Sequence, residues 1–115
     1  MASGLGSILY PVKDVAHAKA LYSALLGMEP HSDAPYYVGF RVGDLEIGLV
    51  PNGHDQGMTG PVPYYAVNDI HQHLEQLVAA GATVQQQPRN VGGGRLVALV
   101  KDADGNDVGL MQDTQ

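Results

Sequence analysis

Hydrophobic side chains in the first half of the chain form one helical stripe and several short apolar segments. From Val15 to Leu26 they stand three and four positions apart, as one face of a helix requires. Asp14 precedes this run as an N-cap, and Gly27 follows it where helices commonly end. Short apolar segments around the helix predict strands at residues 5–12, 28–32, 36–42 and 45–50, with Gly43-Asp44 as a tight turn. The first half therefore predicts the order βαβββ.

The second half shows the same order of elements. Asp69 is the next N-cap, the residues from Ile70 to Val78 carry an apolar helical stripe, and Gly81 ends it. Asp104-Gly105 is the last tight turn. The segment 51–60 contains one Pro and three Gly without periodicity, so we expect an exposed linker. The remaining apolar segments predict strands at residues 62–67, 83–87, 96–101 and 107–112.

The two halves are also similar in residues. Val12-Lys13-Asp14-Val15 matches Val67-Asn68-Asp69-Ile70, and Ile47-Gly48-Leu49 matches Val108-Gly109-Leu110. A duplicated unit of this size is one supersecondary module whose apolar face needs a partner. We therefore expect one domain over 1–115, with module one at about 5–50, the linker at 51–60 and module two at about 61–113.

Composition excludes several classes of function. The 115 residues include six Lys and Arg against twelve Asp and Glu, a net charge of −6, which argues against binding to nucleic acid or an anionic membrane surface. The absence of Cys excludes disulfides and thiolate metal sites. Apolar runs are too short to span a membrane, and the first ten residues contain no basic residue, so we expect a cytoplasmic protein.

Three segments together resemble the vicinal oxygen chelate superfamily, which includes glyoxalases, bleomycin resistance proteins and extradiol dioxygenases. The first, Tyr10-Pro11-Val12-Lys13-Asp14-Val15, precedes a helix that ends with Leu25-Leu26-Gly27-Met28. The second is the turn Val42-Gly43-Asp44 leading into Leu45-Glu46-Ile47-Gly48-Leu49. The third, Lys101-Asp102-Ala103-Asp104-Gly105-Asn106, is similar to the family's DPDGN turn with Ala103 for Pro. The resemblance extends from about residue 8 to 111.

The resemblance implies an α+β fold of two tandem βαβββ modules. Their sheets would form a curved mixed sheet around a cavity, with the helices on the convex side. In the family's enzymes, His, Gln or Glu from the first and fourth strands of each module hold a divalent metal in the cavity. The resemblance also implies a homodimer.

The family's four metal-ligand positions fall on residues that are poor ligands in this chain. They are Ser7 and Gly48 in module one, and Val62 and Gly109 in module two, which together offer a single hydroxyl group. Glu46 is the nearest substitute of the same strand parity. We interpret the five histidines as solvated or capping residues, and no serine has the setting of a catalytic nucleophile. The expectation is no metal, no cofactor and no catalytic residue.

Strand alternation predicts which side chains line the cavity. If Val62 faces it, Tyr64 does too, and the glycines of the fourth strands would leave space there. Arg41 and Arg95 could pair with an anionic ligand group, whereas the acidic chain would attract a cation, so the charge of the ligand stays open. The predicted ligand-binding residues are Ser7, Tyr37, Arg41, Gly48, Val50, Val62, Tyr64, Arg95, Gly109 and Met111.

Three functions remain open. We rank the metal-free one first because the four ligand positions lack metal-binding side chains. The first is a protein that binds a small organic molecule without metal, sequestering a drug or metabolite as the antibiotic-resistance branch of the family does. The second is a metal-dependent lyase, isomerase or dioxygenase that uses atypical ligands. The third is a structural or regulatory module that binds another protein.

Overall fold

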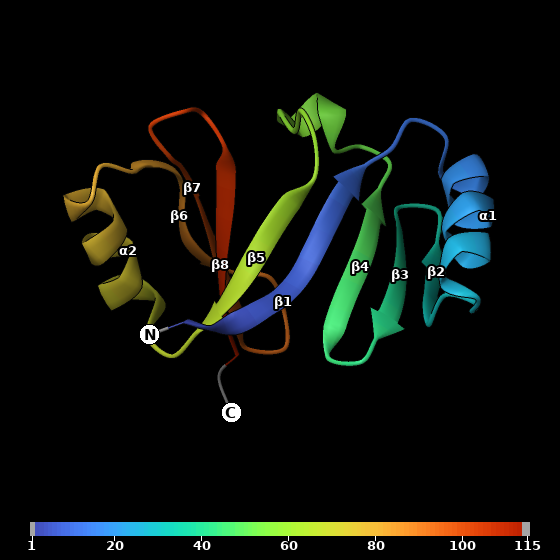
Figure 1. Ribbon diagram of the computed structural model, residues 1–115, viewed down its shortest axis with the longest axis horizontal. Helices are drawn as coiled ribbons and strands as arrows, with labels where there is room; N and C mark the ends of the chain where they lie inside the picture. The colour runs from blue at the N-terminus through green and yellow to red at the C-terminus, as the bar shows by residue number, and fades with distance from the viewer. Residues whose placement is uncertain (1, 114–115) are drawn as a thin grey trace. The chain divides into compact units, whose positions relative to one another are not determined.

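The computed structural model describes residues 2–113, with side chains from residue 4, and it has an α+β fold (Figure 1). Each half of the chain contains one helix and four strands, so both predicted βαβββ modules are present. A short 3₁₀ helix, η1, lies in the linker between them. The elements in chain order are β1 (Ala2–Pro11), α1 (Val15–Leu26), β2 (Ser32–Ala34), β3 (Tyr37–Val42), β4 (Leu45–Val50), η1 (His54–Gln56), β5 (Val62–Val67), α2 (Ile70–Ala79), β6 (Thr83–Asn90), β7 (Arg95–Lys101) and β8 (Asp107–Asp113).

The chain divides into two compact units, and strand β1 contributes residues to both. One unit, Ser7–Val62, contains the second half of β1 and all of α1, β2, β3 and β4. The other unit combines the chain up to Gly6 with the chain from Pro63 onward.

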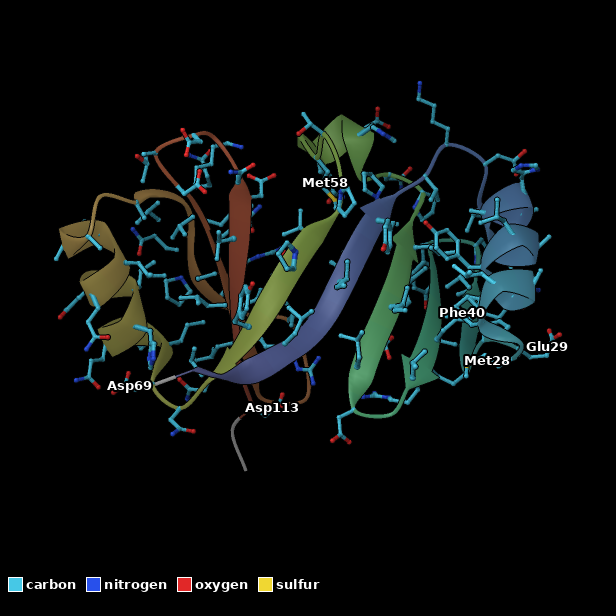
Figure 2. The ribbon with its side chains drawn as sticks, in the orientation of Figure 1. Met28, Glu29, Phe40, Met58, Asp69 and Asp113 are labelled. Atoms are coloured by element: carbon cyan, nitrogen blue, oxygen red, sulfur yellow. The ribbon has the colours of Figure 1, made fainter. Side chains whose placement is uncertain are left out.

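In the unit Ser7–Val62, the strand order is β2-β3-β4-β1, with β4 and β1 parallel and the other pairs antiparallel. Its core contains Val38, Phe40 and Leu49, whose side chains alternate onto one face of the sheet. Helix α1 covers this face with Val15, Ala18, Tyr22 and Leu26. Figure 2 shows Phe40 on this side of the sheet, beside α1.

The unit that contains Pro63 repeats this arrangement. The order is β5-β8-β7-β6, with β5 and β8 parallel and the other pairs antiparallel. Helix α2 packs Ile70 and Leu74 against Val67, Ala98, Val100 and Leu110. In each unit, therefore, a helix covers one sheet face, and the opposite face is the candidate for a functional site.

Both predicted helix starts are confirmed. The Asp14 carboxylate accepts a hydrogen bond from the His17 backbone N–H at 3.0 Å, and Asp69 accepts one from Gln72 at 3.1 Å. Gly27 ends α1 in the left-handed conformation (φ 67°), where glycine has no Cβ to be strained.

The strand predicted at residues 28–32 is wrong in position, because the structure places β2 at Ser32–Ala34. The Met28 backbone N–H bonds back to the Ser23 carbonyl, so the chain is still completing the end of α1. Pro30 has no N–H for a sheet ladder. The apolar Met28 packs against the helix-side core instead of marking a strand.

Strands β4 and β5 match their predicted bounds fully, and β3, β7 and β8 differ from theirs by one residue. Strand β1 spans Ala2–Pro11, so it begins three residues before the predicted residue 5. Strand β6 extends to Asn90, beyond the predicted residue 87, and its pairing with β7 has two register irregularities. No helix within residues 2–113 is long and apolar enough to cross a membrane.

Candidate functional site

The sheet face of β1, β3 and β4 that points away from α1 brings several predicted residues together. Because Val38, Phe40 and Leu49 point toward α1, alternation places Tyr37, Gly39 and Arg41 on the opposite face. Arg41 pairs with Glu46 across β3 and β4, and Gly39 pairs with Gly48. Ser7, which is buried, lies opposite Glu46 in the parallel pairing of β1 with β4.

Glu46 is the centre of a polar cluster on this face. The Tyr37 hydroxyl donates to Glu46 Oε2 at 2.6 Å, and His31 Nε2 lies 2.7 Å from Oε1. A guanidinium nitrogen of Arg41 lies 3.4 Å from the same Oε1. The Glu46 side chain is only 12% exposed, so these partners replace the water that a carboxylate would otherwise need. We call His31, Tyr37, Arg41 and Glu46 the Glu46 cluster.

The Tyr37 ring lies directly over two glycines. A Cβ built on Gly48 would meet the Tyr37 hydroxyl at 2.5 Å and Cε1 at 2.7 Å, and one on Gly39 would meet Cε2 at 2.8 Å. Neither glycine has a positive φ, so the backbone conformation does not require glycine at these positions. Glycine is required because the Tyr37 ring leaves no room for a Cβ. The glycine at the expected metal-ligand position 48 is thus the floor beneath a tyrosine ring.

The other unit contains the same combination of glycine and tyrosine. Tyr64 pairs with Gly109 across β5 and β8, and a Cβ on Gly109 would meet Tyr64 Cδ2 at 2.3 Å. Met111, two residues further on, is buried and contacts Gly6, whose Cβ would meet its sulfur at 2.4 Å. Both fourth-strand glycines are therefore covered by aromatic rings, an arrangement that stabilises glycines in strands.

Burial raises the pKa of the Tyr64 hydroxyl above its ordinary value of 10.0; nearby Arg89 opposes this effect and Asp107 adds to it. We expect Tyr64→Phe to remove a phenolate absorbance component that appears above pH 10 in a spectrophotometric titration. Because the folded-state pKa is the higher one, the contribution of Tyr64 to stability is lost as pH rises above about 10. If Tyr64→Phe removed only absorbance that appears at pH 10 or below, the buried position of this hydroxyl would be contradicted.

Arg95 has a different environment from Arg41. Its Nε donates to Asp113 Oδ1 at 2.6 Å and its terminal nitrogen to Oδ2 at 3.3 Å, a two-point ion pair across β7 and β8. Lys101 likewise donates to Asp107 at 2.6 Å. Asp113 therefore already occupies the guanidinium fork of Arg95 that could bind an anionic ligand.

The remaining predicted residues are apolar. Val50 is half-buried and pairs with Pro11 across β4 and β1. Val62, the first residue of β5, is fully buried at 1% exposure.

The donor set does not fit a divalent metal. Ser7, Gly48, Val62 and Gly109 offer one hydroxyl between them, and both oxygens of Glu46 already have hydrogen-bonding or ion-pair partners. Between residues 4 and 113, no three His, Cys, Asp or Glu side chains are grouped so that they could hold a metal ion. Glu46 is the nearest substitute for a metal ligand at position 48, and the cation beside its carboxylate is Arg41.

His31 is the site residue that sequence reasoning missed. It lies in a bend before β2, and its backbone N–H bonds to the Gly39 carbonyl at 2.9 Å. Strand parity says nothing about such a residue, because a bend has no regular alternation. The sequence therefore carried no local signal for the contact of His31 with Glu46.

The comparisons with known proteins give a family and a fold. The family model of the Glyoxalase/Bleomycin resistance protein/Dioxygenase superfamily matches residues 4–110. No curated protein sequence matches this chain.

Solved structures share the fold at low sequence identity. A methylmalonyl-CoA epimerase from Mycobacterium tuberculosis is 16% identical with a TM-score of 0.73, over 99% of this chain and 90% of that one. A superfamily member from Vibrio splendidus 12B01 is 16% identical with a TM-score of 0.71, over 94% and 97%. A Mn(II)-bound glyoxalase from Novosphingobium aromaticivorans is 18% identical with a TM-score of 0.75, over 97% and 39%.

The family match covers nearly the whole chain, and the two βαβββ modules provide the expected architecture. This chain belongs to the Glyoxalase/Bleomycin resistance protein/Dioxygenase superfamily, the family that its motifs resemble.

Proposed function

We propose that this protein binds a small organic molecule without a resident metal ion, and that it sequesters a drug or metabolite. The observation that carries this proposal is the environment of the two fourth-strand positions. Each is a glycine beneath a tyrosine ring, so these positions present aromatic surface where the family's enzymes present metal ligands.

The composition of the Glu46 cluster and its surroundings supports the proposal. The Tyr37 ring and the neighbouring Leu9 side chain provide apolar surface, and both come within 2.7 Å of a Cβ built on Gly48. Tyr37, Arg41 and His31 place polar groups beside that surface. Small-molecule sites generally combine apolar walls with a few convergent polar groups.

The proposal is tested by combining metal analysis with a thermal-shift screen of drug-like compounds and metabolites. Protein purified without a metal-affinity tag is expected to contain no stoichiometric divalent metal. Ligands are expected to raise the melting temperature equally with and without a chelator, because binding to the native state stabilises it by mass action.

A pair of adjacent tyrosines provides the matched control. Tyr37→Ala is expected to abolish a ligand-dependent thermal shift, whereas Tyr36→Ala should preserve it because Tyr36 is 73% exposed. Equal losses in both variants, or ligand binding that requires an added metal ion, would contradict the proposal.

A metal-dependent lyase, isomerase or dioxygenase is the second candidate, and one observation favours it. His31 Nε2 and Glu46 Oε1 are 2.7 Å apart, so a metal ion that replaced their hydrogen bond would find an imidazole and a carboxylate, both common metal ligands, side by side. This function requires that Mn²⁺, Zn²⁺, Ni²⁺ or Fe²⁺ stabilise the wild-type protein and lose that effect in His31→Ala.

A further inference from the structure

We propose that the Glu46 cluster recognises a carboxylate group of the ligand, with Arg41 as its anchor. This inference rests on the proposed function and deepens it by naming the chemistry of the bound group. All four residues of the cluster lie in the unit Ser7–Val62.

Arg41 is held by Glu46 but is not saturated by it. Its contact with Glu46 Oε1, at 3.4 Å, is longer than a normal charge-assisted hydrogen bond, and its side chain is 54% exposed. Glu46 is its one ion-pair partner among the described side chains. A guanidinium group carries five N–H donors in a planar fork, so most of its donors remain available to a second acceptor.

The other ion-paired cations in the described part of the chain are more tightly engaged. Arg95 makes two hydrogen bonds to Asp113, and Lys101 donates to Asp107 at 2.6 Å. Lys19 pairs closely with Asp33 on the surface. Arg41 therefore has the longest of these ion-pair contacts, and it shares its partner Glu46 with Tyr37 and His31.

The occupied oxygens of Glu46 decide the charge of the ligand. Oε2 accepts from Tyr37, while Oε1 faces both His31 and Arg41, which leaves little capacity for a cationic ligand group. The exposed members of the cluster are the donors, since His31 is 43% exposed and Arg41 54%. Although the chain carries −6 overall, short-range donors determine which group fits at this point.

A single carboxylate fits this site better than a phosphate. The positive charge of Arg41 is partly balanced by Glu46, so the cluster has no surplus of cations to neutralise a dianion. Both a carboxylate and a phosphate can form two parallel hydrogen bonds with the guanidinium fork, so the charge of the group decides between them. The geometry points to Arg41 as the ligand-contacting residue and to Glu46 as the residue that positions it.

The test uses three compounds of the same shape and different charge: benzoate, benzamide and benzamidine. Binding to the full chain is followed by the NMR shifts of the Gly39 and Gly48 amides and the Arg41 side chain. Benzoate is expected to bind at these residues at least about tenfold more tightly than benzamide, as a charge-assisted hydrogen bond implies. Phenyl phosphate is expected to bind more weakly than benzoate.

The variants separate the role of Arg41 from a general loss of charge. Arg41→Gln is expected to abolish the preference for benzoate over benzamide, and Arg41→Lys should restore only part of it. Lys13→Gln removes one positive charge from an exposed residue of the same unit and should leave the preference unchanged. Tighter binding of benzamidine, or a preference that survives Arg41→Gln, would overturn the carboxylate assignment.

The outcomes also distinguish this inference from the proposed function. If benzoate and benzamide bind equally at Gly39 and Gly48, the face binds small molecules but the carboxylate assignment fails. If the compound screen and all four of these probes leave the signals unchanged, both proposals fail together.

Discussion

Replacing Gly109 by alanine is expected to lower the free energy of unfolding by about 1–3 kcal/mol, the usual cost of overpacking a well-filled site. The added methyl group would lie 2.3 Å from Tyr64 Cδ2 and 2.6 Å from Cγ and Cε2. These atoms belong to the root and edge of the ring rather than to a flexible end, so the whole tyrosine must move. Urea denaturation monitored by circular dichroism measures the loss.

Two controls show whether the tyrosine causes this cost. Gly60→Ala introduces the same methyl group at a glycine with nothing within 4 Å and no positive φ, and it should change stability by less than about 0.5 kcal/mol. In a Tyr64→Ala background, Gly109→Ala should cost much less than in the wild type, because the clashing ring is gone. Additive effects of the two substitutions would contradict the described contact.

Replacing Glu46 by glutamine is expected to cost about 2 kcal/mol, because hydrogen bonds to a charged group contribute about 1.5–3 kcal/mol each. Glutamine keeps the shape of the side chain but provides only one acceptor oxygen. Tyr37, His31 and Arg41 now share the two carboxylate oxygens, so at least one would lose its partner. Thermal and urea unfolding of the variant measure the effect.

The surface pair of Lys19 with Asp33 offers the matched comparison. Asp33→Asn makes the corresponding carboxylate-to-amide change where the side chain is 49% exposed, and it should cost clearly less than Glu46→Gln. Similar losses for Glu46→Gln and Asp33→Asn would mean that the burial of Glu46 contributes nothing. A gain in stability for Glu46→Gln would mean that its desolvation outweighs its hydrogen bonds.

Local chemistry explains why most of the fold could be predicted from the sequence. Asp14 and Asp69 cap the two helices through their own side chains, and Gly27 ends α1 without needing any distant residue. The position of β2 was not predictable in this way. Met28 is as apolar as a strand residue, and only the tertiary core beside α1 determines that it packs there.

The candidate site was predictable in part for a similar reason. Alternation correctly indicates that Tyr37 and Gly48 share a face, because that depends on backbone geometry alone. It does not predict that the Tyr37 ring lies on the glycine, since that choice of rotamer depends on the hydrogen bond to Glu46. The partnership of His31 with Glu46 depends on a bend, which has no periodic signature.

Strand β1 belongs in part to each of the two compact units. The repeat in the sequence suggests that the boundary between the units lies in the segment 51–60, but the unit that contains α2 also includes the first half of β1, up to Gly6. A fragment that begins after this segment would lack the glycine backbone against which Met111 lies. The second copy of the motif is therefore not an autonomous piece, because the packing around its buried Met111 is completed by a glycine that comes before the helix of the first copy.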